Sequence, residues 1–139
     1  MKNVVVTGMG VISCIGSGLN EVVSSLKNGK SGIKSNPTYK EMGFRSHVSG
    51  SVDINLSELI DRKVLRFMSE ASGFAYLATQ EALINAGLDL SSIDTSRIGI
   101  IAGSGGASSA AQIEASDIAR VKGPKRIGPY AVTKTMGST

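Results

Sequence analysis

The residues that could act as nucleophile or base in this chain are few and isolated. The sequence has one cysteine, Cys14, and one histidine, His47. A reactive thiolate needs a nearby cation, histidine or helix N-terminus to stabilise its charge, and Cys14 is flanked by the apolar Ile12 and Ile15 instead. A histidine without a paired nucleophile is usually structural, and one His with one Cys cannot complete a zinc shell. We expect no catalytic residue and no metal site in this span.

Two groups of basic residues are stronger candidates for a binding surface. Arg62, Lys63 and Arg66 lie within five positions, and Lys125 and Arg126 lie between two Gly-Pro turns. Such spacing can place basic side chains on one face of a helix or bend. One interpretation is an ordinary solvated surface. The other is a docking patch for an acidic protein or a phosphate, which would accelerate association electrostatically.

Two glycine turns partly match the dinucleotide-binding pattern G-x-G-x-x-G. Thr7–Gly10 supplies its first two glycines, but Ser13 occupies the third position, and Gly103–Gly105 continues to Ser108 in the same way. The third glycine permits close packing of helix on strand, so its replacement weakens the match. A dinucleotide-binding domain of an oxidoreductase is therefore kept as an alternative. The second turn, Gly103–Gly106, also has few side chains, so a ligand could contact its backbone directly.

The elements that must position these residues alternate between strand and helix. Val4–Val6 and Arg97–Ala102 are rich in β-branched residues and predict buried strands, and 47–52 predicts an edge strand. Ser69 and Gly87 are typical start and stop signals for a helix. Apolar spacing predicts three helices, over 20–28, 69–86 and 110–120. This pattern favours an α/β fold with a parallel sheet.

The central predicted helix carries a narrow stripe of small residues. So many alanines on one face indicate close contact with another element, and a second copy of the chain is one candidate. The stripe consists of Ala71, Phe74, Ala75, Ala78, Ala82 and Ala86.

Composition excludes several classes of function. The net charge of +4 favours anionic partners only mildly, and 4% aromatic residues without a long basic stripe argue against nucleic acid. No apolar run approaches the ~20 residues that a membrane span needs. A single cysteine precludes an internal disulfide and fits a reducing cytoplasm. The length of 139 residues suits one domain with its own core, but the end of the sequence lacks a stop signal, which favours a fragment.

Taken together, several stretches resemble the bacterial β-ketoacyl-acyl-carrier-protein synthases of type I. The likeness runs along the whole chain and covers roughly the first third of a family member. The stretches that carry it are Val4–Ser13, Arg45–Val48, Asp61–Ser69 (DRKVLRFMS), Ile101–Gly106 (IAGSGG) and Gly128–Lys134 (GPYAVTK).

The resemblance implies a thiolase-like α/β fold. Residues 1–139 would form the N-terminal segment of the first α/β half, with a mostly parallel mixed sheet and cap helices, in a cytoplasmic homodimer. The implied activity is that of an acyltransferase of fatty-acid biosynthesis, which condenses acyl groups with malonyl-acyl-carrier protein by decarboxylation and uses no cofactor. The family's catalytic cysteine and histidines have no counterpart here. This span alone is therefore expected to be inactive, in effect a docking or dimerisation module.

The resemblance also assigns a role to the basic groups. Arg62, Lys63 and Arg66 match family residues that receive the acidic acyl carrier protein. Lys125 and Arg126 fall near a second basic patch with the same role.

Three further positions match residues around the acyl chain. Gly106 matches a position against which the acyl chain lies, and Gln112 and Met136 match residues near the acyl pocket at the dimer boundary. Ala107 stands where the type I pattern has a third consecutive glycine, which would narrow that wall slightly.

Overall fold

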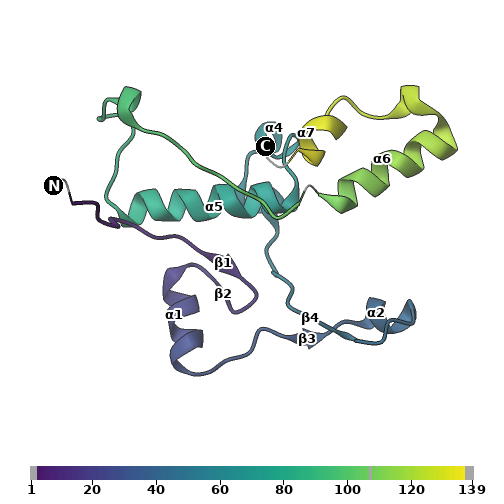
Figure 1. Cartoon of the computed structure of the whole chain (residues 1–139), viewed down its shortest axis with the longest axis horizontal. Helices are drawn as coiled ribbons and strands as arrows, with labels where there is room; N and C mark the ends of the chain where they lie inside the picture. The colour runs from purple at the N-terminus through teal and green to yellow at the C-terminus, as the bar shows by residue number, and fades with distance from the viewer. Residues whose placement is uncertain (1–2, 107, 137–139) are drawn as a thin grey trace. The chain divides into compact units, whose positions relative to one another are not determined.

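The computed structural model describes residues 3–106 and 108–136 (Figure 1). The chain divides into two compact units, the first made of Met1–Ile54 with Leu77–Asp89 and the second of Asn55–Tyr76 with Leu90–Thr139. The long helix α5 (Glu70–Asn85) contributes its N-terminal part to the second unit and its C-terminal part to the first.

The first unit consists of short elements around a small hairpin. Ser25 of α1 is buried, and its hydroxyl donates a 2.6 Å hydrogen bond to the carbonyl of Ile15 in the hairpin turn. Gly29 follows α1 with φ of 61°, the left-handed conformation that ends many helices. The elements are β1 (Ile12–Ser13), β2 (Gly16–Ser17), α1 (Leu19–Lys27), β3 (Lys34–Ser35), α2 (Pro37–Glu41) and β4 (Val48–Ser49).

The C-terminal part of α5 packs on the N-terminal segment of the same chain. A Cβ atom on Gly8 would lie 2.7 Å from the Cβ of Ala86, and one on Gly10 would lie 2.8 Å from the backbone nitrogen of Ala82. Because these glycines have no side chain, the backbone of the N-terminal segment can lie close to the backbone of α5. This part of the alanine stripe therefore contacts the chain's own N-terminal segment.

The second unit is mostly helical. Gly73, the buried residue of α5, packs on Leu56 of α3, so that a Cβ there would lie 2.7 Å from a leucine methyl. Its further elements are α3 (Leu56–Leu59), α4 (Arg62–Leu65), η1 (Thr95–Arg97), α6 (Ser109–Lys122), η2 (Pro124–Arg126) and α7 (Ala131–Thr135).

Side-chain caps confirm the two longest predicted helices. The hydroxyl of Ser69 accepts a hydrogen bond from the N–H of Ser72 at the start of α5, and Ser108 accepts one from Ala111 at the start of α6, both at 3.3 Å. Each bond satisfies one of the N–H groups that a helix leaves free in its first turn. Gly87 follows α5 with φ of 66°, as its position in the sequence predicted.

The two runs expected to be buried strands are not strands among the described residues. Val4 is 97% exposed and Ile100 is 84% exposed, and neither 4–6 nor 98–102 is assigned as strand. The described strands make only two antiparallel pairs, β1 with β2 and β3 with β4. The expected parallel pairing is therefore absent from this part of the chain. A strand needs a neighbouring strand for its N–H and C=O groups, and neither 4–6 nor 98–102 has one among the described residues. The edge strand expected over 47–52 is confirmed in part by β4.

The described residues form little core of their own. Val22 and Ile60 are the buried apolar side chains among them. The length had suggested a sizeable core, but most large apolar residues keep substantial exposure. Within the described ranges, no helix has the length and apolar character required to cross a bilayer.

Candidate functional site

The first basic group lies on and directly after α4. The carboxylate of Asp61 accepts a 2.6 Å hydrogen bond from the N–H of Lys63 and so caps this short helix. The side chains of Arg62, Lys63 and Arg66 are exposed. Across residues 3–106 and 108–136, no carboxylate lies within salt-bridge distance of any of them. Their charges are therefore not neutralised by a neighbouring acid.

Arg66 lies against two aromatic rings, which we call the aromatic corner (Phe67 and Tyr130). Its guanidinium carbon is 4.9 Å from the centroid of the Phe67 ring and 5.1 Å from that of Tyr130. The rings meet edge to face, with centroids 4.8 Å apart and planes at 78°. Tyr130 directly precedes α7, so this contact joins the loop after α4 to the start of α7. This role of Phe67 and Tyr130 was not predicted from the sequence, because nothing local indicates which aromatic residues will meet.

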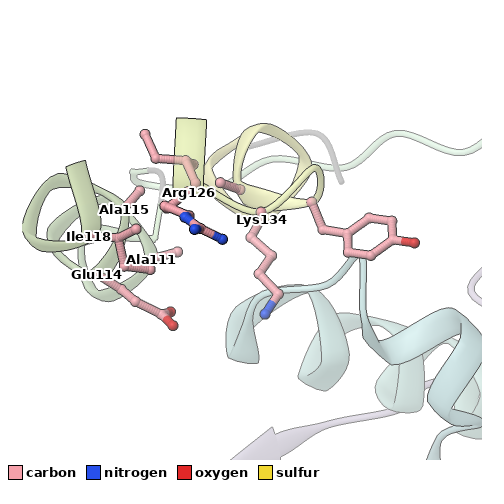
Figure 2. A pocket seen from close by; sticks show the side chains of 10 residues that line it. Ala111, Glu114, Ala115, Ile118, Arg126 and Lys134 are labelled. Atoms are coloured by element: carbon pink, nitrogen blue, oxygen red, sulfur yellow. The ribbon is translucent and has the colours of Figure 1, made fainter. Parts of the chain in front are cut away.

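The second basic group belongs to the same unit. Lys125 and Arg126 lie in η2, are exposed, and have no acidic partner in the described chain. Arg126 borders a hollow of about 330 Å³ between α6 and the η2–α7 segment. Figure 2 shows Glu114 of α6 and Lys134 of α7 at the same hollow. The structure thus places both basic groups in one unit, and Tyr130, which contacts Arg66, also borders this hollow.

The described residues do not gather the three predicted acyl-site positions into a pocket. Gly106, Gln112 and Met136 are all exposed, and none borders the hollow beside Arg126. Around Gly106 a Cβ atom would meet nothing within 4 Å. A local hydrogen bond closes the turn 104–106, in which the hydroxyl of Ser104 donates a 2.7 Å bond to the carbonyl of Gly106. Ala107 lies outside the described residues.

Cys14 and His47 have surroundings that suit structural roles. The sulfur of Cys14 lies against glycine backbone, because a Cβ on Gly32 would be 2.8 Å from it and one on Gly50 would be 3.0 Å from it. The backbone carbonyl of His47 accepts a 2.7 Å bond from the N–H of Asn36 in the β3–β4 pairing. Within the described ranges, no three His, Cys, Asp or Glu side chains come together as a metal site.

Comparison with known proteins identifies the class. Residues 1–139 match the family model for the N-terminal domain of β-ketoacyl synthases. A β-ketoacyl synthase of known structure from Burkholderia phymatum STM815 aligns with 99% of this chain at a TM-score of 0.81 and 24% identity, over 34% of its own length. The chain belongs to the β-ketoacyl synthase family and has the thiolase-like fold that the sequence predicted.

Among curated proteins, the chain is most informatively compared with two bacterial enzymes. It is 49% identical over 140 residues to 3-oxoacyl-[acyl-carrier-protein] synthase 1 of Haemophilus influenzae, covering 100% of this chain and 34% of the relative. It is 46% identical to the protein of that name in Escherichia coli K12, covering 99% of this chain and 34% of the relative. The chain thus spans about a third of the length of these relatives. The family match replaces the dinucleotide-binding alternative, and Gly8 and Gly10 pack on α5.

Proposed function

We propose that this chain is the N-terminal segment, residues 1–139, of a condensing enzyme that elongates fatty acyl groups on acyl carrier protein. The relatives named above are 3-oxoacyl-[acyl-carrier-protein] synthases and are identical to it at nearly half of the aligned positions. The exposed apolar runs at 4–6 and 98–102 support the proposal. Burial of such runs beneath strands and helices from the rest of the enzyme would be favourable, because it removes apolar surface from water.

The chemistry implied by this assignment proceeds through a thioester on the enzyme. The acyl group passes from the carrier's thiol to a cysteine of the remaining chain, and the carrier's thiol is released. A malonyl group on a second carrier then loses CO₂, and the electron pair left on its α-carbon forms a bond to the acyl carbonyl carbon. The enzyme's cysteine sulfur leaves, and a β-ketoacyl thioester remains on the carrier. No residue of this segment acts as the nucleophile, so residues 1–139 alone are proposed to be inactive.

The observation that carries the docking role is the set of exposed, unneutralised cations in the second unit. We assign Arg62, Lys63, Arg66, Lys125 and Arg126 to the surface that receives the acidic acyl carrier protein. Cations that already have acidic partners would gain little from a further acid, whereas these keep their full charge for a partner. Charge complementarity of this kind raises association rates and fixes the orientation of the encounter.

The remaining parts of the proposal concern the acyl chain and the assembly. Gly106, Gln112 and Met136 are proposed to line part of the acyl pocket, and their exposure leaves them available to a second protomer or to further chain. The enzyme is proposed to be a homodimer. A cytoplasmic location is supported by the single, unpaired Cys14.

Charge reversal tests the docking surface. In the full-length gene product, Lys63→Glu with Arg66→Glu should weaken binding of acyl carrier protein about tenfold, since each exposed ion pair contributes up to about 1 kcal/mol. Titration calorimetry at low salt measures the affinity. The difference should shrink at about 1 M salt, where the Debye length falls to about 3 Å.

A matched variant separates local docking from overall charge. Lys30→Glu with Lys40→Glu changes the net charge by the same amount at exposed positions of the first unit. This control should bind the carrier protein nearly as well as the parent. Equal weakening by both pairs, or no weakening by the first pair at low salt, would count against the docking surface.

A further inference from the structure

Arg66 differs from the other cations of the proposed docking surface in being held. Its guanidinium lies within the ~6 Å of a ring centroid at which a cation is attracted by an aromatic face, and it does so at both Phe67 and Tyr130. Arg62 and Lys63 make no ring contact or ion pair in the described part of the chain. One of three neighbouring cations is therefore restrained while the other two extend freely into solvent.

The restraint leaves the donor groups of Arg66 available. No carboxylate within the described ranges pairs with its guanidinium, and the side chain remains exposed. A guanidinium presents a rigid fork of N–H donors that can bind a carboxylate or phosphate in a bidentate manner. The contacts with Phe67 and Tyr130 are made to ring faces, which attract the positive charge but do not use the N–H donors of the guanidinium.

A pre-held arginine has an advantage in binding. A long, freely rotating side chain loses rotamer freedom when a partner fixes it, and this loss opposes association. A side chain already restrained in the free protein loses less. Backbone hydrogen bonds support the aromatic corner at both residues, since the N–H of Phe67 donates a 3.1 Å bond to the carbonyl of Val64 and the carbonyl of Tyr130 accepts a 3.1 Å bond from the N–H of Lys134.

We propose that Phe67 and Tyr130 are positioning residues that hold Arg66 ready for an acidic group of the incoming carrier protein. This inference rests on the proposed function, because it assumes that Arg66 is part of the docking surface. It adds that affinity depends on two uncharged aromatic residues that make no contact of their own with an acid. Their influence on binding passes through Arg66 alone.

The test is a double-mutant cycle in the full-length gene product, read as the Kd for purified acyl carrier protein carrying an octanoyl group. Tyr130→Leu keeps apolar bulk but removes the ring face, and should raise Kd about fivefold, about 1 kcal/mol. Tyr130→Phe keeps the ring face and should retain most of the affinity. In an Arg66→Ala background, Tyr130→Leu should have almost no further effect, because the group that it positions is gone.

The chain offers a control for loss of an aromatic pair. Tyr39 and Phe44 also meet edge to face, with centroids 5.2 Å apart and planes at 76°, and no guanidinium stacks on them in the described chain. Tyr39→Leu should leave Kd unchanged. Thermal unfolding reports whether each variant is folded, and Phe67→Leu, with an expected rise in Kd of about threefold, serves if Tyr130→Leu does not fold.

The outcomes separate this inference from the proposed function. If Arg66→Ala weakens binding but the leucine variants do not, or if Tyr130→Leu weakens it equally in the Arg66→Ala background, the positioning role is wrong and the docking surface stands. If Arg66→Ala itself leaves Kd unchanged at low salt, Arg66 has no part in docking, and both statements about it fail. Full coupling between Arg66 and Tyr130 supports both.

Discussion

Removal of the Glu81 carboxylate should destabilise the first unit. One oxygen of its carboxylate accepts a 2.6 Å hydrogen bond from the N–H of Leu19, and the other accepts a 2.9 Å bond from the N–H of Val11. Leu19 is the first residue of α1, and the preceding Gly18 has no side chain with which to cap the helix. Glu81 of α5 therefore caps α1 from another element and also fixes the segment before β1.

The two hydrogen bonds of Glu81 set the expected loss of stability. Hydrogen bonds to charged groups contribute about 1.5–3 kcal/mol each, and partial exposure of Glu81 places its two bonds at the lower end of that range. Glu81→Ala should therefore lower the free energy of unfolding by about 3 kcal/mol. Glu81→Gln keeps one acceptor oxygen but presents an amide donor to the other N–H. It should therefore lower the free energy of unfolding by about half as much as Glu81→Ala does.

Chemical denaturation and hydrogen exchange test this expectation. In the full-length gene product, exchange at the amides of Val11 and Leu19 should accelerate in the order parent, Glu81→Gln, Glu81→Ala. The control is Glu114→Ala on α6, an exposed glutamate with no hydrogen bond or ion pair in the described chain. It should change stability by less than about 0.5 kcal/mol. Equal effects of Glu81→Ala and Glu114→Ala would refute the capping role.

Three further substitutions test separate parts of the structure. Gly10→Ala places a methyl group against the carbonyl oxygen of Ala78 and should cost about 2 kcal/mol of unfolding free energy, whereas Gly128→Ala, which meets open space, should cost far less. At Gly106 an added Cβ atom meets nothing within 4 Å in the described chain, and Gly106→Met should shorten the acyl chains accepted by the full-length gene product, so unchanged turnover of long primers would reduce Gly106 to a turn residue. Cys14→Ser should leave condensation activity nearly intact, and its loss would assign chemistry to that thiol.

Local signals predicted the three longest helices, α1, α5 and α6, but not the shorter ones. Ser69 and Ser108 cap α5 and α6 through hydrogen bonds to residues three positions on, and Gly87 follows α5 in a left-handed conformation. All of this information lies within a few residues of each helix end, where sequence analysis is strongest. The short strands β1, β2 and β3 were missed, because two-residue strands carry no periodicity.

Non-local partners set the limit of prediction. The Val4–Val6 run indicated a buried strand, but burial depends on neighbours that the described residues do not provide. Glu81 was not singled out in the sequence, because nothing in its sequence neighbours shows that it reaches the N-terminus of α1. In the candidate site, the basic residues were proposed from spacing and resemblance, whereas the contact of Arg66 with Tyr130 joins segments far apart in the sequence and could not be predicted locally.

The central claim is that these residues are the docking segment of a larger condensing enzyme and hold none of its catalytic groups. The most direct measurement is elongation of an octanoyl group on acyl carrier protein with malonyl-acyl-carrier protein, followed by the mass of the carrier-bound product. We expect a product longer by one two-carbon unit, with release of CO₂, from the full-length gene product and no product from residues 1–139 alone. Elongation by residues 1–139, or none by the full-length gene product, would contradict it.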